Sequence, residues 1–245
     1  MFVSAVGVPP EWAIEKLKKA GVIYANMVGS PRNAEKAIQA GCSVLIAQGT
    51  EAGGHTGEIA TLVLIRHVVK MAAKFGNKTP DGLDIHVVAA GGIADGEAVA
   101  ACLALGAEGV WVGTRFICAT ESGASQRWQD TVISASPSDT IRTLVVTGRP
   151  VRLFMTPYIK KWETERRDEI RKLCDQGIVP MELDIKETRA KGGQWSLAET
   201  QPLFMGQCVG LTNKIMPAGE IVEELVRDAV KAMDKNQKFI ARAKL

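Results

Sequence analysis

Short apolar runs alternate with amphipathic segments through the first half of the chain. Each run is uniformly apolar, as strands covered on both faces tend to be, and each is followed by a turn rich in Gly or Pro. The runs cover Phe2–Val6, Val22–Val28, Ser43–Ala47, Ile85–Ala90 and Val110–Val112. This alternation predicts a parallel α/β sheet of five strands.

The segments between the runs carry helix start signals. Ser30 and Pro31 occupy cap and first-turn positions, and Asp95 can cap the helix that follows the fourth run. The expected helices cover residues 11–20, 31–40, 59–75 and 95–105. Each helix returns the chain to the same end of the sheet, so the loops that follow the strands should line one common rim.

The pattern changes after Thr114. The later text predicts a helix over 123–135, a strand over Ile141–Val146, and charged helices over 158–174, 181–190 and 220–233. We therefore expect a βα-barrel portion at 1–135 and a mainly helical extension at 136–245 that packs on it. The basic residues between Lys160 and Arg171 alternate with glutamates and are interpreted as a solvated helix face.

Composition narrows the function classes. The 245 residues carry 30 basic and 27 acidic side chains that are scattered along the chain, which gives no indication of nucleic-acid binding. Five separated cysteines indicate a reducing compartment, with no disulfide framework and no metal site. Neither a membrane-spanning run nor a secretory leader is recognisable, so a cytoplasmic protein without a membrane partner is expected.

The most informative stretch is Gln48–Gly57, which follows the third run. It holds four glycines in ten residues together with His55. Glycines at the exit of a buried strand let the backbone lie against a flat ligand. A histidine in such a loop is a candidate base, although a single loop histidine is more often structural.

Two later loops should lie on the same rim. Gly91 and Gly92 stand between a strand and a helix start, where backbone N–H groups and the helix dipole favour an anion. The next run ends in Val112, Gly113 and Thr114, which add backbone donors and a hydroxyl. The three loops together predict a site for a phosphorylated planar cofactor.

At this point the sequence resembles a known family. The segments that carry the resemblance are Gln48-Gly49, Glu51-Ala52-Gly53-Gly54-His55, Ala90-Gly91-Gly92-Ile93, Gly113-Thr114-Arg115-Phe116 and Gly206-Gln207-Cys208-Val209-Gly210. They are similar to the signature segments of nitronate monooxygenases, which are FMN-dependent (β/α)8-barrel enzymes. The similarity covers nearly the whole chain.

The resemblance implies a role for each site residue. His55 would be the catalytic base or the partner of the anionic substrate. FMN would contact Gln48 and Gly53 through its ring or ribityl part, its phosphate would lie on Gly92, Gly113 and Thr114, and Gly91, Trp111 and Val112 would supply neighbouring backbone. The implied reaction oxidises an alkyl nitronate with O2 to a carbonyl compound and nitrite, and a neutral nitroalkane would first lose its α-proton to His55.

The same alignment places Phe2–Val6 at the fourth barrel strand. We therefore expect an incomplete TIM (β/α)8-type barrel with strands four to eight, followed by the helical extension. Unpaired strand edges tend to seek a partner, so a homo-oligomer is a hypothesis.

Alternative functions stay open. An FMN-dependent enoyl-thioester reductase would have a similar Gly-Gly-His loop and would take hydride from NADH or NADPH. A barrel like that of IMP dehydrogenase would need a reactive cysteine on the rim, and none of the five cysteines stands in a convincing rim loop. From a different class, a shortened relative without catalysis would act only through partners.

Overall fold

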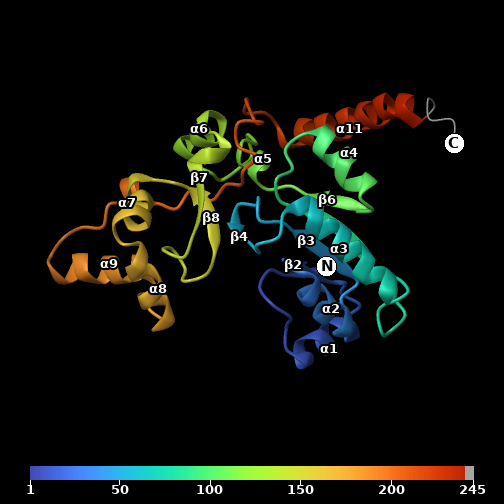
Figure 1. Ribbon diagram of the computed structural model, residues 1–245, viewed down its shortest axis with the longest axis horizontal. Helices are drawn as coiled ribbons and strands as arrows, with labels where there is room; N and C mark the ends of the chain where they lie inside the picture. The colour runs from blue at the N-terminus through green and yellow to red at the C-terminus, as the bar shows by residue number, and fades with distance from the viewer. Residues whose placement is uncertain (241–245) are drawn as a thin grey trace.

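A five-stranded parallel sheet forms the first half of the molecule (Figure 1). The computed structural model describes residues 1–240, and the parallel strands lie in the order β1-β2-β3-β5-β6. Their bounds are β1 (Phe2–Ser4), β2 (Tyr24–Val28), β3 (Val44–Gln48), β5 (His86–Ala90) and β6 (Gly109–Trp111). The five apolar runs are confirmed as strands, with ends that shift by one or two residues.

Four helices connect these strands: α1 (Glu11–Lys19), α2 (Pro31–Gln39), α3 (Thr61–Lys74) and α4 (Gly96–Ala104). The Ser30 hydroxyl accepts a hydrogen bond from the Asn33 backbone N–H at 3.2 Å. The Asp95 carboxylate accepts one from Ala98 N–H at 2.8 Å. Both predicted caps are confirmed, and each satisfies a donor that the first helical turn leaves unpaired.

The largest core lies between the helices and one face of the parallel sheet. Ile38, Leu45, Leu64 and Val87 belong to it and are buried. On the opposite face, Ala25, Ile46 and Ala90 form a smaller cluster. Sequential parallel strands with helices on the outer face are the arrangement of a (β/α)8 barrel, and this chain forms a partial one.

The partial barrel leaves two strand edges open. Within residues 1–240, β1 and β6 each pair with only one neighbouring strand. The homo-oligomer hypothesis rests on these edges and stays a prediction.

A second, antiparallel sheet has the order β4-β8-β7. It consists of β4 (Gly54–His55), β7 (Thr140–Thr143) and β8 (Val151–Phe154). The expected strand over Ile141–Val146 was wrong in extent, because the chain leaves the sheet after Thr143 and turns into β8, which the sequence analysis missed. The histidine loop is the segment Gln48–Gly57, which contains β4. The pairing of β4 with β8 brings this loop against the hairpin formed by β7 and β8.

Helices α7 (Pro157–Glu165), α8 (Arg167–Asp175) and α9 (Pro180–Ala190) lie beyond this hairpin (Figure 1). The expectation of one helix over 158–174 was wrong, because the chain breaks at Arg166. The Arg166 guanidinium stacks 3.5 Å from the centroid of the Trp162 ring and pairs with Glu169 and Asp184. Arg166 thereby joins the three helices around a buried tryptophan.

Shorter elements complete the path between these regions. They are α5 (Thr114–Ile117), α6 (Gln126–Ser134), the 3-10 helix η1 (Pro137–Asp139) and α10 (Leu197–Thr200).

The last helix, α11 (Ala218–Ile240), returns to the first half and lies along α4 (Figure 1). Ile221, Leu225 and Ala229 join the same core as the parallel strands. The predicted division after residue 135 stays a prediction. Within residues 1–240, no helix combines the length and the apolar character that crossing a bilayer requires.

The contact between α4 and α11 predicts the effect of one substitution. A Cβ added to Gly96 would lie 2.4 Å from the Ala229 backbone nitrogen. Gly96→Ala should therefore destabilise the protein by about 1–3 kcal/mol, the usual cost of overpacking. Urea unfolding measures the change, with Gly123→Ala as the control because a Cβ there would meet no atom within 4 Å. Equal stability of the two variants would contradict this packing.

Candidate functional site

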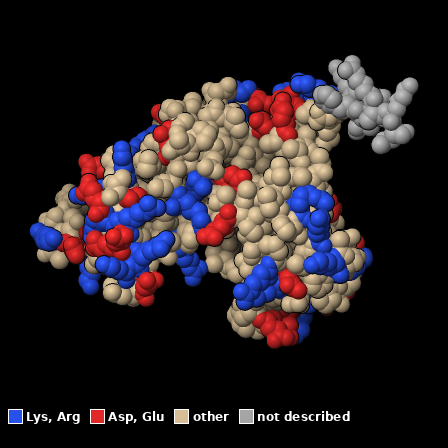
Figure 2. All heavy atoms as spheres, in the orientation of Figure 1, with Lys and Arg blue, Asp and Glu red and all other residues tan. Residues whose placement is uncertain are grey.

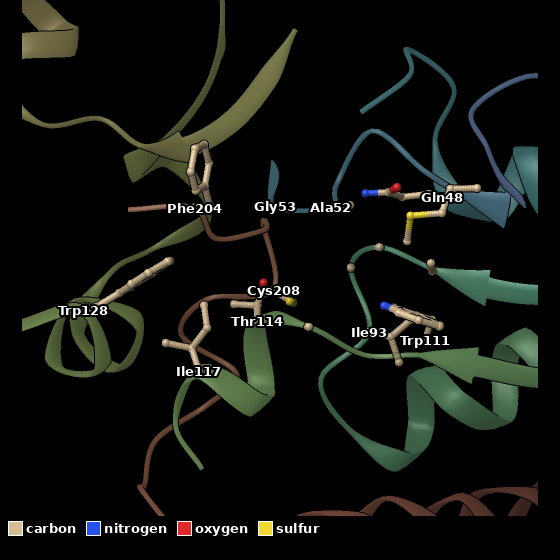
Figure 3. Close-up of a pocket in the computed structure, with 15 residues that line it drawn as sticks. Gln48, Ala52, Gly53, Ile93, Trp111, Thr114, Ile117, Trp128, Phe204 and Cys208 are labelled. Atoms are coloured by element: carbon tan, nitrogen blue, oxygen red, sulfur yellow. The ribbon is translucent and has the colours of Figure 1, made fainter. Parts of the chain in front are cut away.

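The loops that follow β3, β5 and β6 meet at one end of the parallel sheet and enclose a pocket of about 340 Å³. This rim pocket is shown in Figure 3. Of the predicted cofactor residues, those that line it are Gln48, Gly53, Gly91, Gly92, Trp111, Gly113 and Thr114. Val112 does not line it, because its side chain packs against the core of the sheet.

Two glycines of the histidine loop are required by packing within the protein. A Cβ on Gly49 would lie 2.0 Å from the Thr61 hydroxyl oxygen, and a Cβ on Gly53 would lie 2.7 Å from the Met205 carbonyl carbon. We expected these glycines to admit a flat ligand. At Gly49 and Gly53 the structure shows that the close neighbour is another part of the chain.

Glu51 holds the same loop onto the start of α3. Its carboxylate accepts hydrogen bonds from the Thr61 backbone N–H at 2.9 Å and from the Thr61 hydroxyl at 2.9 Å. The preceding residue, Ala60, provides no side-chain cap. Glu51 therefore caps α3 from ten residues upstream and fixes the path of the glycine loop.

The second rim loop needs glycine for a conformational reason. Gly91 and Gly92 have φ angles of +93° and +75°, a region that side chains with a Cβ rarely adopt. The dipole of α4 is already matched by the Asp95 carboxylate. The expectation that this helix start favours a ligand anion stays a prediction, and backbone N–H groups add to the polarity of the loop.

Backbone donors gather between the second and third loops. The N–H groups of Gly92, Gly113 and Thr114 have no hydrogen-bond acceptor within residues 1–240. A Cβ on Gly113 would meet no protein atom within 4 Å, and its φ of −113° suits any residue. Neither packing nor conformation requires glycine at this position, and the space beside it faces the rim pocket.

A segment near the C-terminal end of the described chain closes the rim pocket. The Gly206 backbone N–H donates to the Thr114 hydroxyl at 2.9 Å. Phe204 and Cys208 both line the pocket. Cys208 is a correction to the expectation that no cysteine stands at the rim. Burial raises the pKa of its thiol, so Cys208 stays protonated and is unsuited to nucleophilic attack.

One end of the rim pocket is apolar. Ile117, Trp128 and Phe204 lie together there (Figure 3). None of the three was predicted as a site residue. The Trp128 ring N–H is buried and has no hydrogen-bond partner in the described part of the chain. No motif marks these residues, because they come from α5, α6 and the segment after α10.

His55 lies in an adjoining pocket of about 500 Å³. Met27 and Gln48 line both pockets. The Gln48 side-chain amide donates to the His55 carbonyl oxygen at 3.1 Å. The predicted cofactor residues and His55 therefore line adjoining pockets, with Gln48 in the lining of both.

The hydrogen bonds of His55 indicate its tautomer. The Thr147 hydroxyl donates to the Arg149 carbonyl oxygen at 3.1 Å, so its oxygen accepts from His55 Nε2–H at 3.1 Å. Nδ1 then carries the lone pair of the neutral imidazole. His55 is exposed, so a substrate from solvent can reach that atom.

A family model for nitronate monooxygenase matches residues 1–228. The chain belongs to the nitronate monooxygenase family. It is 35% identical over 243 residues to a protein of Staphylococcus saprophyticus named "Probable nitronate monooxygenase", covering 94% of this chain and 62% of that relative.

Two solved structures are similar to this member of the nitronate monooxygenase family. FabK from Thermotoga maritima is 31% identical with a TM-score of 0.75, and the match covers 97% of this chain and 70% of that one. Nitroalkane oxidase from Streptomyces ansochromogenes is 28% identical with a TM-score of 0.75, covering 95% and 65%. The chain thus spans less than two thirds of its curated relative and of the nitroalkane oxidase.

The rim glycines should differ in their tolerance of a methyl group. Gly53→Ala should lower the free energy of unfolding by about 1–3 kcal/mol because of the clash with Met205. Gly113→Ala should change it by less than about 0.5 kcal/mol because no protein atom stands nearby. Urea denaturation of both variants tests this contrast. A large loss of stability in Gly113→Ala would show that the space at Gly113 serves protein packing.

Proposed function

We propose that this chain carries the FMN site and the catalytic histidine of an enzyme that oxidises alkyl nitronates with O2 to a carbonyl compound and nitrite. The observation that carries the proposal is the assembly of three rim loops into one pocket that shares Gln48 with the His55 pocket. Membership of the nitronate monooxygenase family supports the reaction class. We propose this activity for the whole protein.

The rim pocket fits the phosphate end of FMN. Its size lies in the range of small-molecule sites. Among the described residues, no Lys or Arg lines it, so the phosphate would be held by the free N–H groups of Gly92, Gly113 and Thr114. The open space at Gly113 lets a phosphate oxygen approach the backbone closely. Gln48 and Gly53 would lie beside the ring system.

When bound, FMN supplies the electron transfer from substrate and onward to O2. His55 does the proton chemistry: with a neutral nitroalkane its Nδ1 takes the α-proton, and with a nitronate the protonated ring holds the anion by charge and hydrogen bonding. Thr147 keeps Nε2–H occupied, which leaves Nδ1 to act on the substrate. Gln48 holds the His55 backbone beside the cofactor pocket.

Flavin binding is the first test of the proposal. The purified chain, mixed with FMN and passed over gel filtration, should retain the visible spectrum of the flavin. Gly113→Ala should weaken FMN binding by about tenfold, equivalent to roughly 1.4 kcal/mol, because its methyl group enters the space proposed for the phosphate. Gly123→Ala should bind like the wild type. A colourless wild-type protein would favour the alternative of a relative without catalysis.

His55→Asn should separate cofactor binding from turnover. The exposed side chain can be replaced without a packing defect, so FMN affinity should be nearly unchanged. Oxygen uptake with a nitroalkane should fall by about 10²–10⁴-fold, the usual contribution of a general base. The loss should be smaller with a preformed nitronate, because no proton has to be removed. Unchanged turnover with both substrates would remove His55 from the mechanism.

The enoyl-thioester reductase remains the second hypothesis. The chain is as similar in fold to FabK as to the nitroalkane oxidase, so similarity does not choose between them. Anaerobic mixing of the FMN-loaded protein with NADH or NADPH distinguishes the two. Rapid bleaching of the flavin without a nitronate would favour the reductase.

A further inference from the structure

A polar cleft lined by three arginines lies between β7 and α8. Arg142 comes from β7, and Arg167 and Arg171 come from α8; the cleft has a volume of about 240 Å³. Figure 2 shows Lys and Arg gathered over the α7–α9 side of the molecule, with acidic residues among them. The basic residues of this region were predicted to form a solvated helix face. In the structure, Arg167 and Arg171 line the cleft together with Arg142.

These arginines are poorly paired within the protein. Arg167 and Arg171 form no ion pair with any residue in 1–240. Arg142 approaches Glu58 only at 3.4 Å, and the Glu58 side chain is 84% exposed. The Nε of Arg142 is buried and has no hydrogen-bond partner within residues 1–240. A buried guanidinium donor without an acceptor is costly, so the protein leaves Arg142 incompletely paired.

The surroundings add positive charge. Arg142 stands directly opposite Arg152 in the register of β7 and β8, an arrangement that is unfavourable for like charges. The pKa of Arg152 is lowered by burial and, secondarily, by Arg142. Two carboxylates line the cleft, but Glu163 already accepts a hydrogen bond from the Thr143 hydroxyl. Three guanidinium groups against two carboxylates leave a net positive charge.

The cleft adjoins the His55 pocket. Glu58 and Pro150 line both cavities. Arg149, a further basic residue, lines the His55 pocket next to Pro150. A molecule held among the arginines would therefore lie beside the pocket that contains His55.

We propose that the cleft formed by Arg142, Arg167 and Arg171 binds the diphosphate group of a cosubstrate whose reactive end reaches His55. Arginine recognises phosphate oxygens through paired N–H donors, and two residues on one helix face with a third on the facing strand can surround such a group. The anion site stands by itself. Its assignment to a cosubstrate rests on the proposed catalytic role of the His55 pocket.

Calorimetric titration of the full chain with sodium pyrophosphate tests the site. Excess FMN is present throughout, so that the rim pocket does not compete for the titrant. The wild type should bind pyrophosphate. The double variant Arg167→Gln, Arg171→Gln should bind it about tenfold more weakly, because each charge-assisted hydrogen bond that is lost lowers the binding free energy. Both side chains are exposed, so folding should be unaffected, and a thermal melt confirms it.

Arg32→Gln is the matched control, because Arg32 is exposed on α2 and also forms no ion pair within residues 1–240. It should leave pyrophosphate affinity within about twofold, as expected for a screened distant charge. An equal loss in the control and in the double variant, or no binding by wild type, would overturn the site.

Coenzyme A and NADPH both carry a diphosphate group, so competition with each of them tests which kind of cosubstrate the cleft binds. Displacement of pyrophosphate by coenzyme A indicates an acyl carrier, and displacement by NADPH indicates a nicotinamide donor. Displacement by neither would overturn the cosubstrate assignment. A protein that binds pyrophosphate at the arginines but never retains FMN would keep the anion site and reject the proposed function.

Discussion

The whole site depends on one close approach of backbone to backbone, between the histidine loop and the segment that follows α10. A Cβ on Gly206 would lie 2.6 Å from the Glu51 carbonyl oxygen, and the Gln207 N–H donates to that same oxygen at 2.8 Å. The Gly206 N–H binds the Thr114 hydroxyl. The histidine loop, the start of α5 and the segment after α10 thus meet at Gly53 and Gly206. A side chain at either glycine would hold these segments apart.

The rim pocket and the arginine cleft differ in the kind of hydrogen-bond donor that each offers to a ligand. The rim pocket offers neutral backbone donors and is lined by no basic side chain within the described residues. The cleft beside α8 offers guanidinium groups. Backbone donors are held rigidly by the strands and suit a tightly bound resident group. The exposed arginines of α8 suit a molecule that arrives and departs, because their attraction acts over a distance and is screened by salt.

Local sequence patterns were sufficient to predict the parallel strands and the caps at Ser30 and Asp95, because those features depend on neighbours along the chain. They were insufficient for β8 and for the break at Arg166, which depend on a distant pairing partner and on a stacked tryptophan. The rim loops could be located from their glycines. The packing requirement for glycine at position 53 could not be predicted, because Met205, which lies against Gly53, stands far away in the sequence.

The hydrogen bonds that assemble the site span long stretches of chain. Thr114 with Gly206 and Thr50 with Arg152 join residues 92 and 102 positions apart. Contacts of such separation have a large loop-closure cost and generally form late in folding. The pockets therefore exist only after both halves have come together. A ligand that occupies them stabilises the entire molecule, so its binding should raise the melting temperature of the chain as a single cooperative unit.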